Sequence, residues 1–160
     1  MSVEPIAPYL EPVRKSVTVP LAPAEAFELF TARIASWWPL GERFSISGTR
    51  ATTCAIEPRI GGAVYEVRDD GERLPWGKVL EWEPPRRVVL SWHPGKSPDV
   101  AQQVEVTFVS AGRSTRVELV HRGWQKLGDE AEKVRASYEG GWETVFGSAF
   151  AAAAGRRHGE

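Results

Sequence analysis

Three histidines and one cysteine have the widest chemical scope in this sequence, since such side chains bind metals and act as bases or nucleophiles. They are His93, His121, His158 and Cys54. None of them has the pair spacing of a metal site, and a zinc site needs three or four converging ligands. A single cysteine also excludes an intrachain disulfide and a CxxC motif. We therefore expect no metal and no cofactor.

Standard catalytic signatures are absent, because HExxH, GxSxG and GxGxxG do not occur in the sequence. The segment from Gly71 to Lys78 superficially resembles a phosphate-binding loop. One residue too many separates its glycines, and Val79 follows the lysine where Ser or Thr is needed to reach Mg²⁺. This segment is therefore rejected as a nucleotide site.

His121 is the polar residue that points most directly to a function. One face of a predicted strand carries every second residue of this segment, which are Thr115, Val117, Leu119 and His121. That apolar face should look inward, which places His121 toward the end of a cavity. There it could contact a ligand or act as a general base near neutral pH. The alternative is a core histidine with satisfied hydrogen bonds, which is favoured because the sequence identifies no Asp or Glu partner.

Aromatic residues supply the other candidates, since seven Trp are a large aromatic surface for a chain of 160 residues. Tyr65 shares a predicted strand face with Ala63 and Val67, so its hydroxyl is a candidate polar anchor in an apolar pocket. For any single aromatic residue, packing in the core is the simpler alternative. The predicted ligand-binding set is Trp37, Trp38, Tyr65, Trp92, His121, Trp142 and Phe146.

Two glycines, Gly140 and Gly141, stand directly before Trp142 in a predicted helix. Each costs up to about 1 kcal/mol relative to alanine in a helix interior, which suggests a need for space. The small residues leave room either for a ligand beside Trp142 and Phe146 or for close packing of the helix on a sheet.

The elements that must position these residues begin with a strand over 13–19. Pro23 then suits the first turn of a helix, and the apolar spacing continues to Trp37-Trp38-Pro39, so that two short helices fit as well as one. Six further segments have the spacing and turn signals of an antiparallel meander. They are 53–57, 63–68, 76–82, 87–93, 101–109 and 114–122, and the mixed faces of 76–82 suggest a bulge.

The last element is a helix over 130–154, which would be roughly 37 Å long at 1.5 Å per residue. Gly155 is the predicted cap at its end. A sheet with segregated helices is an α+β architecture. We expect an extended, proline-rich arm over 1–12, one domain over 13–154 and a disordered tail over 155–160.

Several segments together resemble the activator of heat-shock protein 90 ATPase homologue-like family. This family lies within the START/Bet v 1-like (SRPBCC) superfamily, which includes polyketide cyclases. The segments are Val17–Phe30, Trp37-Trp38-Pro39, Gly61–Tyr65, Trp76–Trp92, Ser114–His121 and Gly141-Trp142. The resemblance implies a helix-grip fold, in which a curved antiparallel sheet of six or seven strands wraps around the C-terminal helix. It implies little about the reaction, because this superfamily carries many functions.

The net charge and the hydropathy of the chain limit the kinds of partner that we expect it to bind. The net charge is −1, from 20 basic and 21 acidic residues, so nothing supports a nucleic-acid partner. The longest apolar stretch lies near 146–154, far short of the roughly 20 residues that span a bilayer, so no membrane insertion is expected. No signal peptide is recognised at the start, and a cytoplasmic location is expected. A homodimer is compatible with the sequence, but nothing in it requires one.

The sequence thus predicts a protein that binds a small lipophilic or aromatic molecule between the sheet and the C-terminal helix. One alternative is an enzyme of cyclase or hydrolase type that uses His121 and Tyr65 as acid and base. Another is a co-chaperone-like activator of a heat-shock protein 90 ATPase, although that activity belongs to larger proteins with an additional domain. The sequence favours binding without catalysis and leaves the identity of the ligand open.

Overall fold

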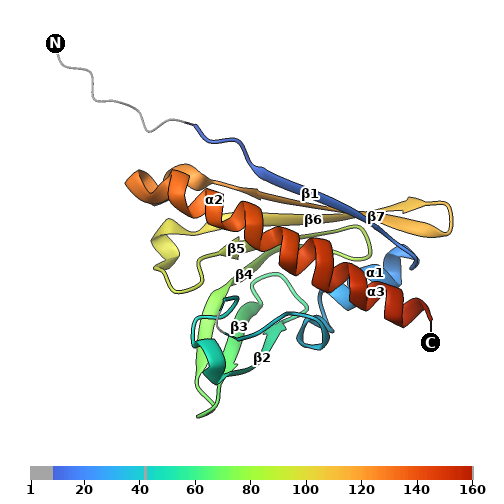
Figure 1. Cartoon of the computed structure of the whole chain (residues 1–160), viewed down its shortest axis with the longest axis horizontal. Helices are drawn as coiled ribbons and strands as arrows, with labels where there is room; N and C mark the ends of the chain where they lie inside the picture. The colour runs from blue at the N-terminus through green and yellow to red at the C-terminus, as the bar shows by residue number, and fades with distance from the viewer. Residues whose placement is uncertain (1–8, 42, 160) are drawn as a thin grey trace.

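A computed structural model describes residues 9–41 and 43–159. Seven strands form one antiparallel sheet with the spatial order β1-β7-β6-β5-β4-β3-β2. The sheet curls around a long C-terminal helix that lies across one of its faces (Figure 1). The strands are β1 (Val13–Val19), β2 (Ala51–Ile56), β3 (Ala63–Arg68), β4 (Arg73–Glu83), β5 (Arg87–Trp92), β6 (Gln102–Ala111) and β7 (Ser114–Arg122). The predicted α+β helix-grip fold is confirmed.

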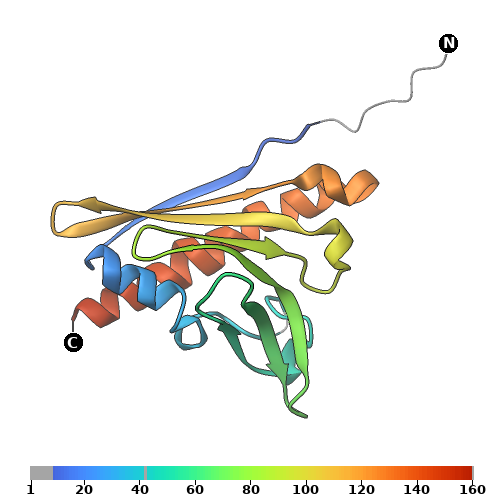
Figure 2. The ribbon, with the colours of Figure 1, turned by 180° about the vertical axis from the view of Figure 1, so that it is seen from behind.

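Two short helices follow β1, which is one of the two arrangements that fit the apolar spacing. They are α1 (Pro23–Phe30), with its proline in the first turn, and the 3₁₀ turn η1 (Ile34–Ser36). The back view shows α1 at the end of the long helix, beside the strands that wrap it (Figure 2). Short 3₁₀ segments connect other elements, at η2 (Gly48–Arg50), η3 (Pro98–Val100) and η4 (Trp124–Glu130).

The C-terminal helix is continuous but not uniform. It consists of α2 (Ala131–Trp142), a π-helical segment η5 (Glu143–Phe150) and α3 (Ala151–His158). The prediction of a disordered tail from residue 155 is wrong for 155–158, because α3 continues through Gly155. Arg156, Arg157 and His158 occupy its last turn, where positive charge interacts favourably with the helix dipole. None of the helices formed by the described residues is long and apolar enough to cross a membrane.

The N-terminal arm is described only in part. Residues 9–12 have no regular structure, and Leu10 packs against the core before β1 begins. Residues 1–8 of the predicted arm, and Glu160 of the predicted tail, lie outside the described residues.

A bulge interrupts the pairing of β4 on each side, as the mixed faces of 76–82 suggest. The register with β3 shifts between Val64 and Tyr65, and the register with β5 shifts between Val79 and Glu81. Trp76 and Val79 consequently both point into the core, whereas Leu80 is exposed. Strict alternation would have placed Leu80 on the same face as Trp76, which is why the sequence did not settle this register.

The face assignment predicted for β3 is wrong. Val64 and Glu66 are fully buried, so Tyr65 lies on the opposite face. There the guanidinium of Arg73 lies 4.4 Å from the centre of the Tyr65 ring, a cation–π contact. The alternation of residues in β3 indicated the wrong inward face because the carboxylate of Glu66 occupies an inward position. Buried carboxylates are rare unless they are hydrogen-bonded.

Candidate functional site

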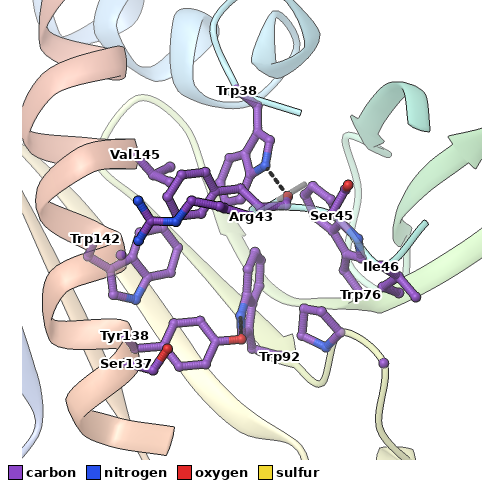
Figure 3. Close-up of a pocket in the computed structure, with 14 residues that line it drawn as sticks. Trp38, Arg43, Ser45, Ile46, Trp76, Trp92, Ser137, Tyr138, Trp142 and Val145 are labelled. Carbon is purple, nitrogen blue, oxygen red and sulfur yellow. Dashed lines mark hydrogen bonds between the residues drawn. The ribbon is translucent and has the colours of Figure 1, made fainter. Parts of the chain in front are cut away.

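A pocket of about 380 Å³ lies between the C-terminal helix, the strands β4 and β5, and the segment 43–46 that leads toward η2. The helix contributes Tyr138, Trp142 and Val145, and the opposite walls contribute Trp38, Trp76 and Trp92 (Figure 3). Phe44 and Pro94 extend the apolar lining, while the exposed Arg43, Ile46 and Ser137 lie at the rim. The walls are therefore mostly aromatic, as in small-molecule sites generally.

Four indole rings form one continuous cluster around this pocket. The ring centre of Trp38 lies 4.9 Å from that of Trp76, 5.9 Å from Trp92 and 5.9 Å from Trp142. Trp92 is 5.6 Å from both Trp76 and Trp142. These separations and the tilted ring planes are those of favourable aromatic pairs. The rings hold one another in place, so the aromatic surface exists before any ligand arrives.

Each indole N–H of this cluster is already used inside the protein. Trp38 donates to the carbonyl oxygen of Phe44 at 2.8 Å, and Trp76 donates to a carboxylate oxygen of Glu66 at 2.7 Å. The hydroxyl of Tyr138 accepts from Trp92 at 3.0 Å. Trp142 donates to Nδ1 of His121, also at 3.0 Å. The four side chains thus line the pocket with apolar atoms, while their N–H groups are satisfied by hydrogen bonds within the protein that orient the rings.

Glu66 fixes two walls of the pocket at once. Its fully buried carboxylate accepts hydrogen bonds from the backbone N–H groups of Ile46 and Ser47 and from the Ser47 hydroxyl, in addition to Trp76. Burial raises the pKa of this carboxyl group, but these four hydrogen bonds together lower it further, so that the pKa lies below its ordinary value. Glu66 is therefore an ionised anchor that ties the segment next to the pocket rim to the Trp76 wall.

His121 lies behind the pocket wall and does not line it. It is fully buried and stacks on Trp124, with ring centres 4.0 Å apart. Nδ1 accepts from Trp142, so Nε2 carries the proton and faces the Gln102 amide oxygen at 3.3 Å. Burial lowers the pKa of His121 to about 3. The ring is therefore neutral at pH 7 and serves to orient Trp142.

Two more residues predicted for the site lie in the core instead. Trp37 donates its indole N–H to the carbonyl oxygen of Leu29 and packs 5.4 Å from Phe30. Phe146 is fully buried and stacks on Phe150 at 5.5 Å. Neither lines the pocket, and Tyr65 points away from it. Of the predicted set, the structure brings Trp38, Trp92 and Trp142 together around the pocket.

Sequence reasoning missed three important wall residues. Trp76 was obscured by the bulges of β4, and Phe44 stands in a polar loop where no periodicity marks it. Tyr138 precedes Trp142 by four residues, so the two side chains share one helix face, and that spacing could have identified it.

Reactive groups are scarce around the site. Burial, and secondarily the charge of Glu66, raise the pKa of the Cys54 thiol to about 12, so the thiol is protonated at neutral pH. Within 9–41 and 43–159, no three His, Cys, Asp or Glu side chains are grouped as metal ligands would be. No titratable side chain hydrogen-bonds to His121 in that part of the chain, since its partners are Gln102 and Trp142.

A curved antiparallel sheet closed by a long C-terminal helix defines the helix-grip class of proteins, and the pocket lies where sheet and helix meet. Residues 20–155 match the family model described as "Activator of Hsp90 ATPase homolog 1-like protein". Since the match covers most of the chain, the protein belongs to this family.

Solved structures agree with this assignment. The chain is 35% identical to an anthrahydroquino-gamma-pyrone synthase, Txn09, over 90% of this chain and 97% of that chain, with a TM-score of 0.63. It is 28% identical to CalC, a self-sacrificing resistance protein from Micromonospora echinospora, over 90% and 94% of the two chains, with a TM-score of 0.65. An Aha1 dimer from Colwellia psychrerythraea is 12% identical over 87% and 99%, with a TM-score of 0.52, and shows the fold alone. Among curated proteins, no sequence matches this chain.

Proposed function

We propose that the protein binds a small, planar aromatic molecule in the pocket walled by Trp38, Trp76, Trp92 and Trp142. The observation that carries the proposal is the fixed orientation of the four indoles, whose N–H groups are satisfied within the protein and whose side chains line the pocket. A flat apolar ligand would stack on these rings and bury apolar surface, which contributes about 25 cal/mol per Å². The resemblance to a synthase named for a fused aromatic product supports this ligand class.

A second candidate function is catalysis on such a molecule, which is favoured by the 35% identity to a protein named as a synthase. The acid–base pair suggested by the sequence does not support it. Tyr65 lies on the outer face of β3, and His121 is a buried neutral ring without a titratable partner. Catalysis here would rest on holding a reactive ligand in one conformation in the pocket.

Other expectations from the sequence stay predictions. These are the cytoplasmic location and the homodimer. Co-chaperone activity is tested by adding the purified protein to a heat-shock protein 90 ATPase assay.

Native mass spectrometry of freshly purified protein is the first test of binding. We expect a minor species heavier than the 17.7 kDa chain by the mass of one small molecule, or a 1:1 adduct after addition of fluorene, a flat tricyclic hydrocarbon. Bare protein in both spectra, together with tryptophan emission that fluorene leaves unchanged, would remove the proposal.

The glycine pair of α2 provides a variant with a matched control. A Cβ at Gly141 would lie at the pocket lining, 3.6 Å from Cε1 of Phe44, whereas a Cβ at Gly140 would meet open space. Alanine should favour the helix at both positions, by up to about 1 kcal/mol. We expect Gly141→Ala to weaken fluorene binding about tenfold, which corresponds to about 1.4 kcal/mol, because its methyl group takes up pocket volume. Gly140→Ala should bind fluorene like the wild type, and equal binding by both variants would contradict this placement of the ligand.

A further inference from the structure

The pocket offers very little hydrogen-bonding capacity in its interior. The four indole N–H groups are used within the protein, as described above. Ser45 also lines the pocket, but its hydroxyl lies within hydrogen-bond distance of the carbonyl oxygens of Gly41 and Gly48. Arg43 and Ser137 are exposed at the rim. Among the side chains of the described residues that line the pocket, the hydroxyl of Tyr138 is the remaining polar group.

The Tyr138 hydroxyl is fixed in position and has a proton to donate. Its oxygen accepts from the indole of Trp92 at 3.0 Å, which occupies a lone pair and leaves the O–H proton unused among the described residues. Figure 3 shows this oxygen beside the Trp92 indole nitrogen, within the ring of pocket side chains. Burial raises the pKa of the hydroxyl more than the bond from Trp92 lowers it, so the proton is present at neutral pH.

The ring of Tyr138 is held as firmly as its hydroxyl. Its centre lies 4.7 Å from that of His121, 5.7 Å from Trp124 and 6.2 Å from Trp142. A donor that is held rigidly in an apolar wall discriminates strongly between ligands, because a ligand without an acceptor covers it and leaves it unpaired.

We propose that Tyr138 is the specificity-determining residue of the pocket and that it selects planar aromatic ligands carrying a hydrogen-bond acceptor, such as a ring carbonyl. The inference rests on the proposed function, since it assumes that an aromatic ligand occupies the pocket. The acceptor would receive the Tyr138 proton while the ring system stacks on the indoles of Trp92 and Trp142.

The test compares fluorenone with fluorene, two flat tricyclic molecules that differ by one carbonyl group. Dissociation constants are measured by calorimetry for the wild type and for Tyr138→Phe. We expect the wild type to bind fluorenone about tenfold more tightly than fluorene, and we expect Tyr138→Phe to bind the two within about twofold. Tyr65→Phe is the matched control, because it removes a tyrosine hydroxyl from the outer face and should keep the wild-type preference.

The outcomes separate this inference from the proposed function. Wild-type protein that binds neither molecule contradicts the proposed function, and the inference falls with it. Wild-type protein that binds both with equal affinity overturns the inference alone, whatever the variant does. A preference for fluorenone that survives in Tyr138→Phe also overturns it, because another group would then donate. Fluorene affinity in Tyr138→Phe equal to or above that of the wild type confirms that the pocket is intact despite the lost acceptor for Trp92, because the variant leaves no hydroxyl unpaired under fluorene.

Discussion

Replacing Glu66 with alanine is expected to lower the free energy of unfolding by about 3 kcal/mol, a large part of the 5–15 kcal/mol of a typical domain. The substitution leaves the buried N–H of Trp76 without its acceptor, which costs about 1–3 kcal/mol, and the part-buried N–H groups of Ile46 and Ser47 lose theirs at a smaller cost, since water can reach them. The same change releases the segment at the pocket rim. Urea unfolding measures the first effect, and faster hydrogen exchange of the Ile46 and Ser47 amides measures the second.

A matched control for this change is Glu81→Ala, which removes an exposed glutamate from the neighbouring strand β4. That variant should unfold within about 0.5 kcal/mol of the wild type, as surface substitutions usually do. If Glu66→Ala were equally mild, and the exchange of the two amides unchanged, Glu66 would not be the anchor described here.

His121 should make the protein less stable as the pH falls below about 6.5. Its pKa in the folded protein is about 3, below the ordinary histidine value of 6.5 that applies to the unfolded chain. Between these values the unfolded chain binds a proton that the folded protein excludes, so stability rises with pH across this window. The slope from this residue is about 1.4 kcal/mol per pH unit, or about 3 kcal/mol between pH 6.5 and pH 4.

The variant that isolates this contribution is His121→Gln, which keeps an acceptor for Trp142 and a donor for Gln102 but does not titrate. Carboxyl groups contribute to acid unfolding in both proteins, so the difference between the two stability curves reports the histidine. Urea midpoints at pH 6.5, 5.5 and 4.5 should converge toward those of the variant as the pH rises. Parallel curves would show that the folded protein accepts the proton.

The fold was predictable because its signals are local and repeated. Alternating strands, Gly and Asp turns and one long helical stripe leave few arrangements other than a sheet against a helix. The end of the helix was not predictable from Gly155, because a glycine that caps a helix and a glycine inside a helix look the same in the sequence. The run of alanines before it and the basic residues after it extend α3 to His158.

The site was predictable only in part, since it depends on which face of each strand points inward. Trp92 and Trp142 follow simple periodicities, and the structure places both at the pocket. Tyr65 was misplaced because the inward position of β3 belongs to Glu66, whose burial depends on donors from residues 46 and 47 and from Trp76. His121 has the predicted inward orientation, but whether it contacts a ligand or an indole depends on Trp142, which is distant in sequence. Such long-range pairing is what periodicity does not encode.

The indole ¹H–¹⁵N spectrum during a titration with fluorenone tests the binding of an aromatic ligand most directly. The chain has seven tryptophans, and single Trp→Phe variants assign their signals. Trp82 is the internal reference, because it lines a separate surface groove with Phe27 and Pro84. We predict that the signals of Trp38, Trp76, Trp92 and Trp142 shift together and saturate, while that of Trp82 stays in place. The account would be contradicted if the signals of all four pocket tryptophans stayed in place, or if only the signal of Trp82 shifted.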